Sequence, residues 1–168
     1  MERLSPKLVQ LLNKQIKNEL DSSRLYRAIS EWCNYEGYLN SATLFKQYAD
    51  EEMAHQDKIY KFLQDRDCLP ETPAADAQPR DFSSLKDVYQ KGLEHEDMVE
   101  SQWKTIYAQC ESDKDYTTCT WSQWFLLEQV EEISKFIGHL DFLDKCGEDN
   151  LGIQFFEQHI HEYLEGEN

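Results

Sequence analysis

Apolar residues recur every three or four positions along most of this chain, which is the spacing of one face of an α-helix. Four long segments carry such a row, at about residues 6–34, 40–67, 84–111 and 117–145, and a shorter fifth covers about 151–164. No segment alternates apolar and polar residues as a strand does. The pattern therefore predicts an all-α protein with four long helices and one short C-terminal helix.

The connections between these segments predict how the helices are arranged. The first two helices, and likewise the third and fourth, are joined by only about five residues, so we expect each pair to form an antiparallel hairpin. Residues 68–82 link the hairpins and contain three of the four prolines. At about 3.3 Å per residue this link spans roughly 50 Å, whereas a helix of about 28 residues is about 42 Å long. We expect an antiparallel four-helix bundle with one long crossover, forming a single domain over residues 1–168.

Each long apolar row is interrupted near its middle by a carboxylate. The interrupting residues are Glu19, Glu52, Glu96 and the pair Glu128 and Glu132. They fall within about one turn of the helix midpoints, which lie at about residues 20, 53, 97 and 131. Since the midpoints of equally long helices share one layer of a bundle, four helices are expected to direct carboxylates to one place in the core.

Ionised carboxylates in a protein core require cations, because transferring even one from water costs several kcal/mol. Glu19, Glu52, Glu96 and Glu132 supply four negative charges, which match the four positive charges of two divalent metal ions. His55 follows Glu52 by three residues, so its ring nitrogen lies on the same helix face. Oxygen and nitrogen ligands without thiolate suit iron or manganese.

Each of these features also has an ordinary interpretation. A Glu-x-x-His pair is common on acidic helices, and clustered glutamates are typical of a solvated face. What favours a metal centre is the coincidence of mid-helix carboxylates in four separate apolar rows. For six other residues an ordinary role in packing, on the surface or in a turn is at least as natural as a role in chemistry. These residues are Tyr26, Trp124, His159, His161, Asp113 and Asp115.

Composition narrows the possible partners to cations. The 33 acidic residues outnumber the 17 basic ones and give a formal charge of -16, which disfavours binding to nucleic acid or to an anionic membrane. No apolar run approaches the roughly 20 residues of a membrane span, and the N-terminus lacks the apolar core of a signal peptide. The five cysteines form no C-x-x-C motif, so we expect free thiols and a cytoplasmic location.

The same residues resemble the bacterial-type non-haem ferritins along nearly the whole chain, from Leu4 to about Leu164. The resemblance rests on four motifs, NELDSSRLY at 18–26, DEEMAH at 50–55, LEHE at 93–96 and QWFLLEQVEE at 123–132. It implies a ferritin-like bundle assembled as a hollow homo-oligomeric shell of twenty-four subunits. It also implies ferroxidase activity, in which O2 or H2O2 oxidises Fe(II) and the ferric mineral is stored inside.

The resemblance assigns roles to individual positions. Glu19, Glu52 and His55 match a first iron site, and Glu52 bridges to a second iron held by Glu96 and Glu132. The remaining matches are to a third iron site (Glu51, Glu128 and Glu131, with Glu132 shared), to a polar position near the centre (Gln129), and to aromatic residues beside it (Tyr26 and Trp124).

Departures from related families limit the resemblance. Haem-binding bacterioferritins repeat Glu-x-x-His on the fourth helix, but here Glu128 is followed three residues later by Glu131, so no haem is expected. The C-x-x-C module of rubrerythrins is absent. Asp21 stands where many relatives carry an aromatic residue, so the surroundings of the first site are expected to differ. Two alternatives remain open: a carboxylate-bridged oxidase or peroxide scavenger that stores nothing, and a structural bundle without metal.

Overall fold

The computed structural model describes residues 3–166, and within them the chain forms five helices and no strand. The helices are α1 (Pro6–Glu36), α2 (Leu39–Asp65), α3 (Leu85–Ser112), α4 (Tyr116–Cys146) and α5 (Asn150–Gly166). This confirms the all-α prediction, and the predicted helix ends lie within about two residues of the observed ones.

Local side chains set the helix ends. Ser5 caps α1 by accepting a hydrogen bond from the Leu8 amide at 3.2 Å, and Pro6 occupies the first turn, where no amide donor is needed. Ser84 caps α3 and Asp115 caps α4 in the same way. Gly37 follows α1 at a φ of 89°, a left-handed conformation that favours glycine.

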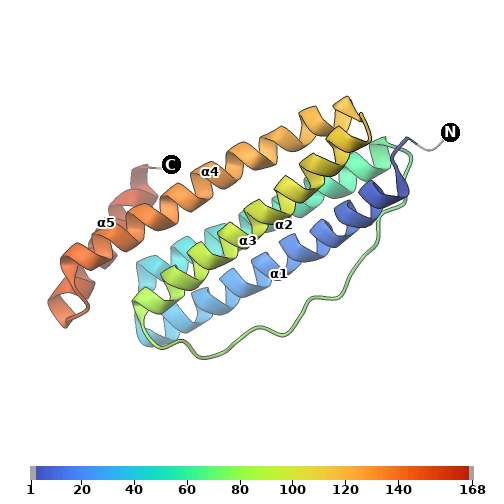
Figure 1. Ribbon diagram of the computed structural model, residues 1–168. Coiled ribbons are helices and arrows are strands. Elements are labelled where there is room, and N and C mark those ends of the chain that lie inside the picture. Colours follow the sequence, from blue (N-terminus) through green and yellow to red (C-terminus); the bar gives the residue numbers. More distant parts are fainter. Residues whose placement is uncertain (1–2, 167–168) are drawn as a thin grey trace.

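The crossover between the hairpins, residues 66–84, runs the length of the bundle beside α1 (Figure 1). Three contacts in order along α1 fix its path. The Glu71 amide donates to Asn13 at 2.9 Å, and the Asp76 amide donates to Asp21 at 2.8 Å. Farther on, Phe82 packs edge-on against the indole of Trp32. The predicted long crossover is therefore confirmed, and two polar side chains of α1 hold it in place.

Helix α5 lies across the end of the bundle and packs against α2 and α4 (Figure 1). Its Glu157 carboxylate accepts hydrogen bonds from the amides of Asn40 and Ser41, at 2.8 and 3.2 Å, and from the Ser41 hydroxyl. These amides belong to the first turn of α2, where the helix leaves donors unpaired. A residue of α5 thus completes the N-terminus of α2.

The hydrophobic core is divided into two clusters along the bundle axis. One contains Tyr26, Phe45, Tyr89 and Phe136, and the other contains Ile16, Ile59, Trp103 and Phe125. On each of the four long helices the chain passes from one cluster to the other through a buried glutamate. These four glutamates are Glu19, Glu52, Glu96 and Glu132. A polar layer therefore separates two apolar halves, as the interrupted rows predict.

Two further expectations concern membrane-spanning helices and the cysteines. None of the helices described over residues 3–166 is long and apolar enough to cross a membrane.

All five cysteines are free, and Cys33, Cys110 and Cys119 are buried. Burial raises the pKa of the Cys110 thiol to about 12, which makes it a poor nucleophile at neutral pH.

Candidate metal centre

Glu19, Glu52 and His55 bring three potential ligand atoms to within 4.8 Å of one another in the polar layer. The Nδ1 atom of His55 lies 3.4 Å from Oε2 of Glu52 and 4.0 Å from Oε2 of Glu19. Within the described part of the chain, neither of these two carboxylate oxygens accepts a hydrogen bond. Buried, unpartnered oxygens facing one another are costly unless a cation or a shared proton lies between them.

The other oxygen of Glu19 accepts hydrogen bonds from two N–H donors. Gln15 donates to Oε1 at 2.8 Å from one turn earlier on α1, and the indole N–H of Trp103 on α3 donates to it at 3.2 Å. Trp103 is fully buried and its ring stacks on Phe125 at 3.8 Å. These contacts fix the rotamer of Glu19, so its free oxygen points toward Glu52 and His55.

Glu96 occupies the same layer and is also bound by neighbouring side chains. The Tyr26 hydroxyl donates to Oε1 of Glu96, and the Gln129 amide donates to Oε2 at 2.7 Å. Burial, followed by the negative charge of Glu96, raises the pKa of Tyr26 well above its ordinary value of 10, so the phenol stays protonated. Helices α1 and α4 thereby orient a carboxylate that α3 carries.

Glu132 completes the layer and has a cation beside it. Lys135, one turn later on α4, places its Nζ atom 3.2 Å from Oε1 of Glu132 and 3.1 Å from Oε1 of Glu131. The Glu132 side chain is only 5% exposed, whereas that of Glu131 is 64% exposed. The lysine therefore bridges a buried and a surface carboxylate.

Burial raises the pKa of all four buried glutamates above the ordinary value of 4.5. For Glu19 and Glu52 the rise is large, and the second cause is a neighbouring negative charge, that of Glu52 and Glu96 respectively. Hydrogen bonds from Tyr26 and Gln129 oppose the rise at Glu96. The pKa of Glu132 rises to about 7, with Lys135 opposing the effect of burial. Without cations the layer holds protons, and a bound cation replaces them.

The outer residues predicted from the sequence are less enclosed. Glu51 and Glu128 are half-buried, and the charge of Glu51 reaches the layer, since it contributes to the raised pKa of Glu132. Trp124 is partly exposed, with its ring edge-on to His55 at a centroid distance of 5.5 Å. The ammonium of Lys58 lies over the Trp124 ring, 3.9 Å from its centroid.

Other predicted positions lie elsewhere and have structural roles. Asp115 caps α4 and pairs with Arg66 at 2.9 Å, and Asp113 accepts a hydrogen bond from Ser5. His159 stacks on Phe142 at 3.9 Å, whereas His161 is exposed. Asp21 binds Lys17 and the crossover amide of Asp76, so its carboxylate serves the crossover.

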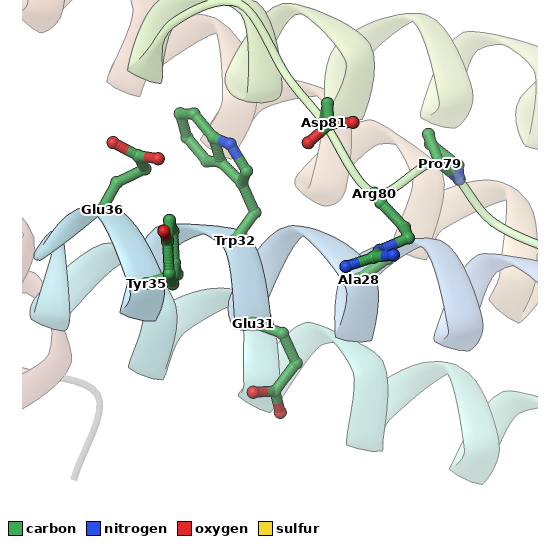
Figure 2. Close-up of a pocket in the computed structure, with 8 residues that line it drawn as sticks. All are labelled: Ala28, Glu31, Trp32, Tyr35, Glu36, Pro79, Arg80 and Asp81. Carbon is green, nitrogen blue, oxygen red and sulfur yellow. The ribbon is translucent and has the colours of Figure 1, made fainter.

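A surface groove of about 480 Å³ lies between the C-terminal part of α1 and the crossover, and it contains none of the predicted ligands. Figure 2 shows the indole of Trp32 between Glu36 of α1 and Asp81 of the crossover, with the Arg80 side chain reaching over α1 at Ala28. Acidic, basic and aromatic side chains all line this groove.

Sequence reasoning named Tyr26 and Gln129 but missed the three other residues that contact the candidate ligands, Gln15, Trp103 and Lys135. Trp103 stands in the apolar row of α3 two turns after Glu96, and nothing in that row distinguishes an indole that packs from one that also donates a hydrogen bond. Gln15 precedes Glu19 by four residues, and Lys135 follows Glu131 by four. This i,i+4 spacing is the signal that was present for both.

The fold and this layer define a ferritin-like four-helix bundle with a candidate glutamate and histidine metal site. The sequence profile of the ferritin-like domain matches residues 9–146, and the chain belongs to the ferritin family. It is 34% identical over 157 residues to a bacterial non-heme ferritin of Staphylococcus aureus strain USA300, covering 94% of this chain and 95% of that protein. Over the same shares, it is 29% identical to a bacterial non-heme ferritin of Escherichia coli O6:H1.

The fold comparison agrees with the family. The open pore ferritin of the hyperthermophilic archaeon Archaeoglobus fulgidus superposes with a TM-score of 0.92 at 26% identity, covering 95% of this chain and 98% of that one. The similarity therefore includes α5 as well as the four long helices.

Proposed function

We propose that this protein is an iron-storage ferritin with ferroxidase activity. It binds Fe(II) within the helical bundle, oxidises it with O2 or H2O2, and keeps the ferric product as mineral inside a hollow homo-oligomeric shell. The observation that carries the proposal is the buried layer of four carboxylates and one histidine between two apolar clusters. Membership of the ferritin family supports iron as the cation.

Two Fe(II) ions account for the charge of this layer. In the proposal Glu19, Glu52 and His55 bind the first ion, and Glu52 bridges to a second ion bound by Glu96 and Glu132. Four negative charges then balance four positive ones. Oxidation to two Fe(III) ions raises the positive charge to six, so the carboxylates stabilise the oxidised pair more than the reduced pair. The two electrons released reduce O2 to H2O2, or H2O2 to water.

Tyr26 and Gln129 act on the second ion through Glu96 in this proposal. Their hydrogen bonds to the two oxygens of Glu96 hold the carboxylate in place before iron arrives. Such partners of a ligand commonly change metal affinity or activity by roughly 10- to 100-fold when they are removed.

Glu51, Glu128 and Glu131, with Glu132 shared, form the proposed third iron position. The family resemblance, together with the field of Glu51 at Glu132, supports it. We further propose a cytoplasmic shell of twenty-four identical subunits without haem. The charge of -16 per chain attracts Fe(II) and makes assembly sensitive to ionic strength.

The test adds Fe(II) in air to the purified protein and follows the ferric-oxo absorbance together with particle size. We expect rapid oxidation, and iron that stays with shell-sized particles. Glu52→Ala removes the ligand common to both ions and is expected to abolish rapid oxidation while the shell still folds. Glu94→Ala, which changes an exposed residue of α3, is the control and is expected to leave the oxidation rate unchanged. Oxidation at the wild-type rate in Glu52→Ala contradicts the site. A dimer that releases its ferric product indicates the non-storing oxidase instead.

A further inference from the structure

A lysine occupies the junction between the two-ion centre and the proposed third iron position. The Nζ atom of Lys135 lies 3.1 Å from Glu131 and 3.2 Å from Glu132, and its side chain is only 15% exposed. Glu131 and Glu132 are two of the four carboxylates assigned to the third position. A cation of the chain itself therefore already binds two of the carboxylates proposed for the third iron ion.

The contact follows from the helix geometry. Lys135 stands three residues after Glu132 and four after Glu131, so all three side chains share one face of α4. The buried carboxylate of Glu132 holds the ammonium partly away from water, where screening by salt is weak. The iron-free protein therefore holds a partly buried ion pair on α4.

The ammonium has space into which it can withdraw. A groove of about 520 Å³ between α4 and α5 is lined by Lys135 together with Glu131, Ser134, Gly138, His139 and Tyr163. A lysine rotamer directed into this groove would take the ammonium away from Glu132 and leave Glu131, already 64% exposed, without this lysine. Displacement of the ammonium therefore requires no unfolding.

We propose that Lys135 competes with the third iron ion. Its ammonium neutralises part of the charge of Glu131 and Glu132 in the iron-free protein, and a third ion binds only by displacing it toward the groove. Of the ligands of the two-ion centre Lys135 contacts only Glu132, whereas it contacts two of the four carboxylates of the third position, so the two-ion centre keeps Glu19, Glu52, His55 and Glu96 and fills first. This inference rests on the proposed function and specifies how the third position differs from the other two.

The test measures anaerobic Fe(II) binding to the assembled protein by calorimetry. Lys135→Gln removes the charge while keeping much of the side chain, and Lys135→Arg retains the charge. Lys104→Gln is the matched control, because Lys104 forms an i,i+4 pair with Glu100 on α3 at 2.7 Å. Removing one positive charge next to the ion is expected to tighten binding of the third Fe(II) at least about tenfold in Lys135→Gln.

The outcomes separate this inference from the proposed function. Tighter third-ion binding in Lys135→Gln, with wild-type behaviour in Lys135→Arg and Lys104→Gln, supports the competition. The competition is overturned if the affinity for the third Fe(II) is unchanged in Lys135→Gln, or if Lys104→Gln changes it equally. The proposed function still stands in that case, provided that each chain binds two Fe(II) ions tightly. Absence of two tight ions from the wild-type protein overturns both.

Discussion

Trp103 donates its indole N–H to Glu19 at 3.2 Å, which links a residue of α3 to a candidate iron ligand of α1. Together with Gln15 it engages one oxygen of Glu19 and leaves the other to face His55 at 4.0 Å. A residue of the apolar core thus determines which carboxylate oxygen is presented to a cation. The centre depends on its packed surroundings as well as on its ligands.

Removing this hydrogen bond is expected to weaken the first iron site. Trp103→Phe retains a ring that can stack on Phe125 but lacks the N–H donor. We expect about a tenfold loss in the affinity of the first Fe(II), by analogy with other groups that orient metal ligands. Anaerobic calorimetry measures it. Trp121→Phe is the control, since Trp121 stacks on Phe62 in the same cluster; equal losses in both variants would point to packing alone.

The iron-free protein is expected to lose stability as pH rises from about 5 to 8. The pKa of Glu132 is about 7 in the folded protein and 4.5 in an unperturbed carboxyl, so between these values the folded state holds a proton that the unfolded chain has released. The free energy of unfolding therefore falls as pH increases through this window, by up to about 3 kcal/mol for this group.

Urea unfolding of the metal-free protein, at fixed protein concentration, measures this slope. Glu132→Gln cannot titrate and is expected to flatten the dependence, whereas Glu131→Gln, at an exposed position, leaves most of it. A Glu132→Gln variant whose stability falls as steeply as that of the wild type shows that Glu132 is not the source.

Two glycines offer a matched test of the packing around the layer. A Cβ at Gly92 would overlap the ring of Phe136, whereas nothing lies within 4 Å of a Cβ at Gly138. We expect Gly92→Ala to destabilise the protein by about 1–3 kcal/mol through overpacking. Gly138→Ala is expected to stabilise it by roughly 0.5–1 kcal/mol through helix propensity. Thermal unfolding distinguishes the two, and a shift of the same sign in both contradicts the geometry at Phe136.

Glu157 is expected to hold α5 against the bundle. The Glu157 carboxylate accepts hydrogen bonds from the amides of Asn40 and Ser41. Glu157→Gln removes its negative charge and is expected to lower the free energy of unfolding by about 1–3 kcal/mol. In Glu157→Gln, amide hydrogen exchange in α5 and in the first turn of α2 is expected to be faster than in the wild type, whereas exchange in α1 is unchanged. Glu162→Gln, an exposed change on the same helix, is the control. Unchanged protection of α5 in Glu157→Gln indicates that apolar packing alone secures it.

The pattern of residues predicted the helices and the position of the polar layer because both follow from helical periodicity. Glu19, Glu52, Glu96 and Glu132 interrupt apolar rows at their midpoints, and that information is local to each helix. The contact between Trp103 and Glu19 could not be predicted, since it depends on how α3 is rotated against α1. Likewise, the role of Asp21 depends on the path of the crossover, which length alone does not determine.

In the proposed function, carboxylates from four helices hold two ferrous ions in the bundle core. Crystals of the protein loaded with Fe(II) without oxygen, measured at the iron absorption edge, test it directly. We expect two anomalous peaks per subunit in the polar layer, with Glu52 bound to both. A layer without iron, in which Glu19, Glu96 and Glu132 remain bonded only to protein groups, would contradict the account.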